Sequence, residues 1–439
     1  MKIAIIGGGP AGMTAASRIK AIRPEWQVAV FEESQFVSHA LCGIPFYVGG
    51  AIKHLEELCV YDPEFFKKER GIEVYTETKV IEVGNRYLIS TRDNKELYFE
   101  WDKLLFATGS KPQKLDVENE DLEGILSVGN IKIAEEIRRR AIKAENIIIV
   151  GSGYIGVEMA EAILRLGKKV MVIEAQERPL PEYDAEIAAI LKAEMEKNLN
   201  LKLSEKVVAF EGRDKVEKVI TNKSQYNCDL AIVAVGVSPN TEIAEGLVEL
   251  GKSGAIKTNN KMETTRENVY AAGDCSESIN VITKKPDWIP LAAPANKMGY
   301  VAGANIAERE LIYPGSLKSQ LTSFFDIEIG KVGLSEHEAI REGFEVVSAF
   351  ITSRHCAKYL PGGLLHLKVV ADRSGKLLGI QAVGSGVSMR IYAASALLYN
   401  NCDVQSLFFT DFPYYPPSSR VWDPLVIAAR ILFRKLNLP

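Results

Sequence analysis

The chain has 439 residues, of which 47% are hydrophobic and 25% charged, a composition typical of a globular protein of about three domains rather than of a disordered chain. A formal net charge of -4 excludes a broad basic surface, so we expect no nucleic-acid partner. No uninterrupted apolar run approaches the roughly 18 residues of a membrane span, and the six cysteines form no CxxC pair that would indicate a disulfide framework or a zinc site. We therefore expect a cytoplasmic protein with reduced thiols, no bound metal and no membrane contact.

The first glycine-rich segment, GGGPAG at 7–12, follows the apolar run KIAII and precedes a stretch with helical periodicity. This is the strand, loop and helix pattern of a dinucleotide-binding unit. In that pattern Gly7 allows the tight turn, Gly9 admits a pyrophosphate and Gly12 lets the helix approach the strand. Glu32 ends the next apolar run, VAVFE, where a carboxylate accepts hydrogen bonds from ribose hydroxyls. We predict a nucleotide site here.

Cys42 lies beyond this loop in SHALCGIPFYVGG, with no second cysteine beside it. The structural alternative is a small buried hydrophobe, which is what a free cysteine usually is. Its place before an expected helix favours a redox role instead, because the partial positive charge of a helix N-terminus favours a thiolate. We predict that Cys42 is a redox-active thiol. For His39, a packed side chain and a role near the thiol both stay open.

The pattern recurs in NIIIVGSGYIGVEMAEAILRLGKKVMVIEA, which begins at residue 146. Gly151, Gly153 and Gly156 occupy the loop, and Glu174 ends the strand that follows, so we predict a second nucleotide. A carboxylate at this place accepts from the adenosine ribose and repels a 2′-phosphate, which favours NADH over NADPH. Arg178 lies nearby and could soften this preference, so use of both coenzymes stays open.

Three further segments end apolar strands in residues that suit nucleotide contacts. WDKLLFATGS ends near Thr108 and Gly109, and CDLAIVAVGVSPN repeats that shape around Gly236. ENVYAAGDCSE places Asp274 where a carboxylate can bind a polyol hydroxyl. Taken alone, each segment is equally typical of an ordinary strand-to-turn junction.

In this order the segments resemble the flavoprotein family with two dinucleotide-binding domains, the pyridine nucleotide-disulfide oxidoreductases. The resemblance implies an α/β fold with two Rossmann-like nucleotide-binding domains and a C-terminal α+β dimerisation domain, and hence a homodimer. It assigns 1–112 and 241–318 to an FAD domain, 113–240 to an NAD(P)H domain and 319–439 to the dimerisation domain. The first loop and the AAGD segment then bind FAD, and the second loop binds NAD(P)H.

Within the family, the chain resembles the single-cysteine branch. Members that are like glutathione reductase carry two cysteines separated by four residues and a C-terminal histidine, and this chain has neither. The segments SHALCGIPFYVGG, AAGD, PANKMGYVAGANI and VWDPL closely resemble those of archaeal coenzyme A disulfide reductases. Pro10 stands where NADH peroxidases and many oxidases of the branch have a histidine, which disfavours peroxidase chemistry.

The resemblance also implies the remaining site residues. Tyr359 and Tyr414 match tyrosines that reach across the dimer to the partner's Cys42 and flavin, and Tyr415 is a weaker candidate. Cys356 could act as a second thiol, but a packed sulfur is the favoured interpretation. The positions that match coenzyme A-binding residues of the family are Thr14, Arg18, Ser38, Arg70 and Lys297.

The implied activity is FAD-dependent reduction of coenzyme A disulfide by NAD(P)H, with polysulfide or elemental sulfur as further acceptors through bound coenzyme A. In such a cycle Cys42 forms a mixed disulfide with coenzyme A. An NADH oxidase that reduces oxygen, with Cys42 cycling through a sulfenate, stays open as an alternative. A reductase of a ferredoxin- or rubredoxin-like protein is a second alternative, although such enzymes need no thiol at this point.

Overall fold

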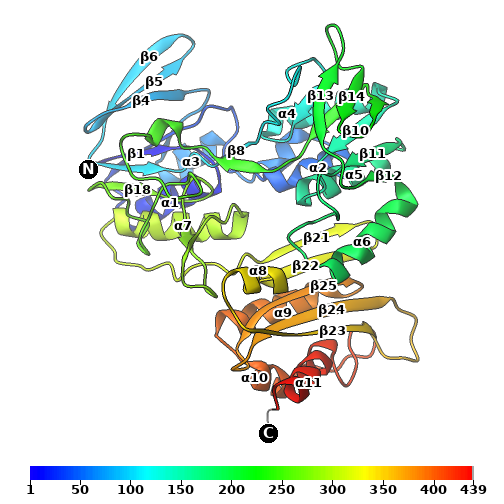
Figure 1. The fold of residues 1–439 in the computed structure, drawn as a ribbon. Helices are drawn as coiled ribbons and strands as arrows, with labels where there is room; N and C mark the ends of the chain where they lie inside the picture. The colour runs from blue at the N-terminus through cyan, green and yellow to red at the C-terminus, as the bar shows by residue number, and fades with distance from the viewer. Residues whose placement is uncertain (438–439) are drawn as a thin grey trace. The chain divides into compact units, whose positions relative to one another are not determined.

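The computed structural model describes residues 1–437, which form two compact units (Figure 1). The first unit contains Met1–Gln113, Gly129–Glu136 and Val237–Ser316. The second contains Lys114–Val128, Ile137–Gly236 and the chain from Leu317 onward. Each unit has its own sheets and its own hydrophobic core.

The first unit is built on a parallel sheet of five strands. In sheet order these are β18 (Val269–Ala271), β7 (Lys103–Phe106), β1 (Lys2–Ile6), β2 (Gln27–Phe31) and β3 (Glu73–Tyr75). Alternate side chains of β1 enter different cores, because Ile3 and Ile5 face one side of the sheet and Ala4 and Ile6 face the other. The sheet is therefore buried on both faces, as is usual for parallel sheets.

Helices cover one face of this sheet and a three-stranded meander covers the other (Figure 1). The helices are α1 (Pro10–Ile22) and α7 (Ala292–Ile306). They approach closely because residue 299 of α7 is a glycine. A Cβ there would lie only 2.2 Å from the carbonyl oxygen of Ala11 in α1. The meander consists of β4 (Lys79–Val83), β5 (Tyr87–Arg92) and β6 (Lys95–Glu100).

Shorter elements complete the first unit. Helix α3 (Pro63–Arg70) begins at Asp62, whose side chain accepts a hydrogen bond from the Phe65 N–H, and ends at Gly71 in the left-handed region. The others are α2 (Ile44–Val48), β8 (Ser110–Pro112), β17 (Val237–Pro239), β19 (Ser278–Ile279), β20 (Pro286–Asp287) and the 3₁₀ turns Leu41–Gly43, Leu55–Leu58 and Glu242–Ala244.

The second unit repeats the parallel arrangement. Its strands, in sheet order, are β12 (Asn200–Lys202), β11 (Val170–Ile173), β10 (Ile147–Val150), β16 (Leu230–Val233) and β9 (Ile125–Ser127). The helices of this part are α4 (Ile131–Lys143), which begins in the first unit, α5 (Tyr154–Arg165) and α6 (Ala185–Asn198). A second meander is formed by β13 (Val207–Glu211), β14 (Lys218–Thr221) and β15 (Gln225–Asn227).

The C-terminal part of the second unit is an antiparallel sheet with helices. Its strands, in sheet order, are β21 (Gln320–Phe324), β22 (Ile327–Gly333), β25 (Leu377–Gly384), β24 (Leu364–Asp372) and β23 (Val346–Arg354). The helices are α8 (Glu336–Arg341), α9 (Val387–Tyr399), α10 (Val404–Phe409) and α11 (Pro424–Leu436). Helix α9 packs on β22 and β25, and α11 packs on β23 and β24.

A buried charge cluster connects the start of α6 to the C-terminal part of the second unit. Asp184, at the start of α6, accepts hydrogen bonds from the Gln381 side chain at 2.6 Å and the His337 ring at 2.9 Å. Burial raises the pKa of Asp184, but the hydrogen bonds from the Glu336 N–H and from His337 outweigh it, and the pKa falls to about 2. Lys368, whose side chain is only 3% exposed, supplies the opposite charge.

The structure confirms the predicted fold class, an α/β fold with two Rossmann-like sheets and a C-terminal α+β part. The residue boundaries given for the domains stay a prediction. Within residues 1–437, no helix combines the length and the apolar character needed to cross a membrane.

Candidate active site

The first glycine-rich loop joins β1 to α1, and its glycines have two different causes. A Cβ at Gly7, where φ is +107°, would lie 2.1 Å from the Ala107 carbonyl oxygen, and a Cβ at Gly12 would lie 2.0 Å from the Gly7 carbonyl oxygen. These two positions need glycine for packing within the protein. A Cβ at Gly9 would meet no protein atom within 4 Å, so its side-chain space is left for a ligand such as a pyrophosphate.

Glu32 follows β2 and is held at the edge of this loop. Its Oε2 accepts from the Gly8 N–H and its Oε1 from the Ser34 N–H, both at 2.8 Å. Each carboxylate oxygen keeps a second lone pair for another donor, such as a ribose hydroxyl. The side chain is half-buried, so this second face is within reach of a ligand.

The second glycine-rich loop, between β10 and α5, repeats this geometry. A Cβ at Gly151 would lie 2.5 Å from the Ala234 carbonyl oxygen and one at Gly156 would lie 2.2 Å from the Gly151 carbonyl oxygen, whereas one at Gly153 would meet nothing within 4 Å. The loop therefore fits a second nucleotide in the way that the first loop fits its own.

Glu174 is held more tightly than Glu32 and is only 7% exposed. Its Oε2 accepts from both the N–H and the hydroxyl of Ser152 at 2.8 Å, and its Oε1 accepts from the Gln176 N–H at 2.8 Å. Arg178 uses its guanidinium within its own loop, donating to the carbonyl oxygens of Tyr183 at 3.2 Å and Pro181 at 3.4 Å. These bonds give Arg178 a structural role in addition to the effect on coenzyme preference that the sequence suggested.

Thr108, Gly109 and Asp274 lie at the carboxyl ends of β7 and β18, which are neighbours in the first parallel sheet. The Ser110 hydroxyl donates to Oδ2 of Asp274 at 3.1 Å, and burial raises the pKa of the Asp274 carboxyl. The Thr108 hydroxyl donates to the Asn240 carbonyl oxygen. Carboxyl ends of strands are where open α/β sheets bind ligands, so these residues share an edge with the first loop.

Two of the strand-end glycines have a positive φ, +71° at Gly109 and +117° at Gly236. A side chain at either position would strain the backbone. Gly236 follows β16 in the second unit. It therefore lies near the carboxyl edge of the second parallel sheet, as the repeated pattern predicts.

Cys42 lies in the 3₁₀ turn Leu41–Gly43, which leads into the short helix α2, and its side chain is exposed. The turn rests on the segment after Leu58, since the Ala40 N–H donates to the Leu58 carbonyl oxygen at 2.8 Å. A Cβ at Gly43 would lie 2.3 Å from the Leu58 side chain. The turn is therefore packed closely against Leu58, whereas the Cys42 side chain is exposed to solvent.

The other five cysteines are less accessible than Cys42. Burial raises the pKa of Cys228 to about 12 and raises that of Cys275, so both stay protonated at neutral pH. Burial and the charge of Glu56 raise the pKa of Cys59. Cys356 is fully buried and its Sγ contacts the Pro361 carbonyl oxygen at 3.5 Å, which supports the packed interpretation of this sulfur.

Three of the five predicted coenzyme A residues lie on the paired helices α1 and α7, namely Thr14, Arg18 and Lys297. The Thr14 hydroxyl donates to the Asn296 side chain at 2.8 Å, and the Arg18 guanidinium lies 4.4 Å from the centre of the Tyr300 ring. Within residues 1–437 the Arg18 Nε has no hydrogen-bond partner although it is buried, so a donor is left for a ligand.

Arg70 and Ser38 lie on neighbouring segments of the first unit. Arg70 ends α3, and its guanidinium lies within 5.8 Å of the rings of Tyr61, Phe65 and Phe66. The Ser38 N–H donates to the Gly8 carbonyl oxygen at 2.9 Å, which ties its segment to the first glycine-rich loop. For His39 the question stays open, since its buried Nδ1 has no partner among the residues described.

Tyr359 and Tyr414 come together in the second unit although they are 55 residues apart in the chain. Their hydroxyl oxygens lie 3.1 Å apart, and the rings are 73% and 47% exposed. The hydrogen bond with Tyr359 raises the pKa of Tyr414, with burial adding to the effect. Tyr415 is also exposed, and its backbone N–H donates to the Ser419 hydroxyl, so it stays the weaker candidate.

Sequence reasoning missed several residues that hold the predicted ones in place. Ser152 binds Glu174, and Asn296 and Tyr300 contact Thr14 and Arg18. Asn296 and Tyr300 are four residues apart in PANKMGY, so helical spacing around Lys297 could have identified them. The Tyr154 and Tyr183 hydroxyls, which contact each other at the start of α5, gave no such local signal.

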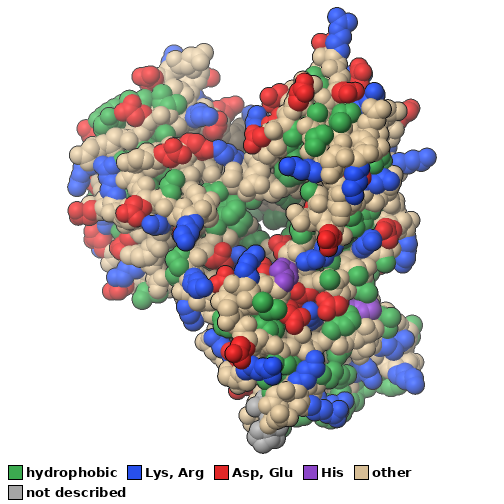
Figure 2. Space-filling model, in the orientation of Figure 1, with side chains coloured by type: hydrophobic (Ala, Val, Ile, Leu, Met, Phe, Trp, Pro, Cys, Tyr) green, Lys and Arg blue, Asp and Glu red, His purple; other side chains and the backbone are tan. Residues whose placement is uncertain are grey.

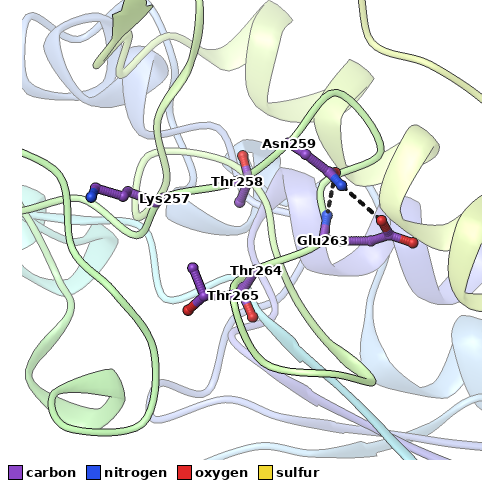
Figure 3. Close-up of a pocket in the computed structure, with 6 residues that line it drawn as sticks. All are labelled: Lys257, Thr258, Asn259, Glu263, Thr264 and Thr265. Atoms are coloured by element: carbon purple, nitrogen blue, oxygen red, sulfur yellow. Dashed lines mark hydrogen bonds between the residues drawn. The ribbon is translucent and has the colours of Figure 1, made fainter.

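One surface hollow of about 250 Å³ lies in the first unit, and none of the residues that line it is a predicted site residue (Figure 3). Its polar groups bind one another, since the Asn259 amide donates to the Glu263 carboxylate at 2.7 Å and the Glu263 N–H donates back to Asn259 at 3.1 Å. We assign no function to it. The lining residues are Lys257, Thr258, Asn259, Glu263, Thr264 and Thr265.

Charged groups of both signs are mixed over the visible surface, and Figure 2 shows no single basic field on that face. Across residues 1–437, no group of three or more His, Cys, Asp or Glu side chains is arranged to hold a metal ion.

Two glycine-rich loops with matched carboxylates and an exposed thiol define a flavin- and nicotinamide-dependent oxidoreductase, and the family comparison agrees. The family model described as pyridine nucleotide-disulphide oxidoreductase matches residues 1–299, and the model of its dimerisation domain matches residues 319–425. The chain belongs to this family. FAD and NAD(P)H are its cofactors, and the two loops fit them.

The chain is 48% identical over 436 residues to the CoA-dependent NAD(P)H sulfur oxidoreductase of Pyrococcus abyssi, which covers 98% of each chain. It is 34% identical over 447 residues, 100% of each chain, to an NADH oxidase of Methanocaldococcus jannaschii. A solved NAD-dependent persulfide reductase from A. fulgidus superposes with a TM-score of 0.97 at 32% identity, covering 100% of this chain and 84% of the other.

Proposed function

We propose that the protein reduces coenzyme A disulfide with NAD(P)H, and reduces polysulfide or sulfur through coenzyme A. The observation that carries this proposal is Cys42, an exposed lone thiol in the same unit as the first nucleotide loop. The similarity to a CoA-dependent sulfur oxidoreductase supports it. The net reaction consumes NAD(P)H, a proton and the disulfide, and yields NAD(P)⁺ and two coenzyme A thiols.

Cys42 acts as the nucleophile in this proposal. Its thiolate attacks one sulfur of the disulfide, the S–S bond breaks, and one coenzyme A thiolate leaves while the other half stays on Cys42 as a mixed disulfide. The first loop, Glu32 and Asp274 would hold FAD, which would supply sulfur with two electrons from NAD(P)H. Those two electrons cleave the mixed disulfide, so Cys42 returns to thiolate and the second thiol departs. One protein sulfur is sufficient.

Tyr359 and Tyr414 supply protons to the departing thiolates. The match of residues 319–425 to a dimerisation domain supports a homodimer, in which this pair serves the partner's Cys42. The raised pKa of Tyr414 keeps it protonated over a wider pH range, which suits a proton donor. No histidine lies in the tail TDFPYYPPSSRVWDPL to take this role.

The cations near the first loop bind the phosphates of coenzyme A. Arg18 offers an unpartnered guanidinium donor, and Lys297 lies on the adjacent helix α7. Arg70 adds a charge at the end of α3, with Thr14 and Ser38 as hydroxyl donors. Charge-assisted bonds to phosphate are stronger than neutral ones, so this set favours an anionic thiol carrier over a neutral disulfide.

The same framework supports two finer assignments. The first loop, Glu32, Thr108, Gly109 and Asp274 bind FAD, and the second loop, Glu174 and Gly236 bind NAD(P)H. Glu174 favours NADH because its carboxylate repels a 2′-phosphate. The domain limits that go with these roles are 1–112 with 241–318, 113–240 and 319–439.

A second candidate function is oxygen reduction, which the similarity to an NADH oxidase favours. In that reaction Cys42 cycles through a sulfenate and no coenzyme A is released. A protein-acceptor reductase fits less well, because it leaves the exposed thiol and the tyrosine pair without a task.

An anaerobic assay separates these functions. The FAD-loaded protein is mixed with NADH and coenzyme A disulfide, and free thiol is measured against NADH consumed. We expect two thiols for each NADH. NADH consumption that starts only when oxygen is admitted, with no thiol released, would establish the oxidase and reject the proposal.

A further inference from the structure

The tail motif VWDPL has no role in the cycle above, yet its aspartate is one of the most constrained side chains of the second unit. Asp423 begins α11, and its Oδ1 accepts from the Leu425 N–H at 3.0 Å. Its Oδ2 accepts from Nη2 of Arg390 at 2.8 Å and from Nε at 3.2 Å. The two side chains are 2% and 9% exposed, so this is a buried ion pair.

Buried ion pairs are weak sources of stability, because desolvation offsets most of the attraction. In this protein the pair connects separate segments of the chain. Arg390 fixes more than Asp423, since Nη2 also donates to the His355 carbonyl oxygen at 3.2 Å and Nη1 donates to the Gly386 carbonyl oxygen at 3.1 Å. One planar guanidinium thus joins the starts of α9 and α11 to the chain at His355.

His355 opens the segment that carries Tyr359, and a second segment carries Tyr414. We call 355–363 and 411–420 the tyrosine loops. The Ala357 N–H of the first loop donates to the Pro416 carbonyl oxygen of the second at 2.8 Å. The Arg420 guanidinium donates to the Ser353 hydroxyl at 2.9 Å, just before the first loop. The loops are therefore stapled to each other and, through Arg390 and Asp423, to both helices.

The tyrosine rings themselves are not held by packing. They are 73% and 47% exposed, yet their hydroxyl oxygens lie 3.1 Å apart. An exposed side chain that makes few contacts cannot fix its own position, so the separation of the hydroxyls depends on the backbones below them.

We propose that Arg390 and Asp423 are positioning residues, which hold the two tyrosine loops at the separation where the Tyr359 and Tyr414 hydroxyls meet. The consequence for catalysis rests on the proposed function of that tyrosine pair. The positioning itself does not, because it is a property of the loops in the resting protein.

The test compares three variants in the FAD-loaded protein. Asp423→Asn keeps an oxygen for the Leu425 N–H but removes the counter-charge, Arg390→Met removes the guanidinium, and Arg390→Lys keeps the charge without the planar fork. Two measurements are made: hydrogen–deuterium exchange of the tyrosine loops without substrate, and thiol release from coenzyme A disulfide.

We expect faster exchange in both tyrosine loops for Asp423→Asn and Arg390→Met. A displacement of about 1 Å can cost on the order of 100-fold in rate, so kcat for thiol release should fall about 10- to 100-fold. The rate at which NADH reduces the flavin, measured by rapid mixing, should stay at the wild-type value. Arg390→Lys should recover part of both losses.

Lys368→Met is the matched control, because it also removes a buried cation of the second unit, one that is 3% exposed and paired with the carboxylates of Asp184 and Glu336. It should leave exchange in the tyrosine loops and thiol release unchanged in the folded fraction. Equal acceleration of exchange in this control would mean general destabilisation and would overturn the inference.

Tyr359→Phe distinguishes the inference from the proposed function. If Tyr359→Phe releases thiol at the wild-type rate, the role of the tyrosines fails, but the exchange measurement still decides the positioning. Unchanged exchange in Arg390→Met overturns the positioning whatever the activity. A third outcome also overturns the inference. In it, Tyr359→Phe impairs thiol release, whereas the Arg390 and Asp423 variants show faster exchange but release thiol at the full rate.

Discussion

The two nucleotide loops have the same backbone plan and differ in how their carboxylates are held. Glu32 receives two backbone N–H donors and is half-buried. Glu174 receives two backbone N–H donors and the Ser152 hydroxyl, and is only 7% exposed. The two loops thus share the glycine pattern, whereas one residue of the loop, Gly8 or Ser152, changes how firmly the carboxylate is held.

The helices behind the loops differ more. Helix α1 packs on α7 through glycine contacts, and these two paired helices carry Arg18 and Lys297. Helix α5 instead begins with Tyr154, whose hydroxyl contacts Tyr183 in the same unit. The first loop therefore combines a nucleotide site with cations and, in the same unit, the exposed thiol. Among the residues that the structure describes, no such cation pair or exposed thiol accompanies the second loop, which we propose to bind the coenzyme.

The variant that should distinguish most sharply between the reactions assigned to the two loops is Cys42→Ser. Serine cannot form the mixed disulfide, so thiol release should fall by orders of magnitude. Reduction of the flavin by NADH, which depends on the second loop, should be unaffected, and slow reaction with oxygen should yield hydrogen peroxide. Steady-state thiol assays and rapid-mixing absorbance measure the two halves separately.

Cys356→Ser is the control, because that sulfur is fully buried and makes no approach to the surface. It should retain thiol release in the folded fraction. Wild-type thiol release by Cys42→Ser, together with loss in Cys356→Ser, would move the chemistry to the second sulfur.

The glycines allow each loop to be damaged in two distinct ways. Gly12→Ala brings a Cβ to 2.0 Å from the Gly7 carbonyl oxygen, so we expect a loss of folding stability of about 1–3 kcal/mol or more together with loss of FAD. Gly9→Ala meets no protein atom, so the apoprotein should keep its stability and lose only FAD affinity. Thermal unfolding of the apoprotein and flavin absorbance measure both.

The same pair in the second loop, Gly156→Ala and Gly153→Ala, should repeat this contrast for NADH binding while flavin content is retained in Gly153→Ala. Equal destabilisation by Gly9→Ala and Gly12→Ala would contradict the distinction between packing glycines and ligand glycines.

These loops are also where sequence reasoning worked best. Gly7, Gly12 and Glu32 act within one short stretch of chain, so their spacing alone predicts their contacts. The contact between Tyr359 and Tyr414 depends on two loops that only the tertiary fold brings together, and local periodicity carries no sign of it. It entered the sequence interpretation through resemblance to a family.

Arg178 and Arg390 show the limit of residue-type arguments. From the sequence, Arg178 was a candidate for softening coenzyme preference, but its guanidinium binds carbonyl oxygens of its own loop. Arg390 carried no sequence signal, because its acceptors at His355, Gly386 and Asp423 come from three separate segments. An arginine's partners are set by packing, which the order of residues alone does not disclose.

Tyr359→Phe tests the half-reaction in which electrons pass to the disulfide and thiols are released. Loss of a positioned proton donor should lower kcat for thiol release by about 10- to 100-fold, while NADH reduction of the flavin is retained. The hydrogen bond with Tyr359 raises the pKa of Tyr414, so the pKa of Tyr414 should fall when Tyr359→Phe removes that bond. Because a proton donor loses activity as pH rises through its pKa, the alkaline limb of the pH profile should move to lower pH.

Tyr415→Phe is the matched control and should keep both the rate and the profile. An alkaline limb that does not move in Tyr359→Phe would show that Tyr414 is not the proton donor.

The smallest expected effect concerns coenzyme choice. Glu174→Gln removes the negative charge, so the ratio of kcat/KM for NADPH to that for NADH should rise about tenfold, as loss of a charged hydrogen bond and of phosphate repulsion implies. Glu32→Gln should instead lower FAD retention without changing this ratio. A ratio that is unchanged in Glu174→Gln would place coenzyme selectivity outside the buried carboxylate.

The central claim is that Cys42 alone carries the substrate sulfur, and mass spectrometry tests it most directly. The oxidised protein is treated with coenzyme A disulfide, freed of excess reagent, digested without reductant and analysed by peptide mass. The account predicts one coenzyme A adduct, located on the peptide that contains Cys42, and its release as thiol when NADH is added. An unmodified Cys42 peptide, or an adduct on another cysteine that NADH releases, would contradict it.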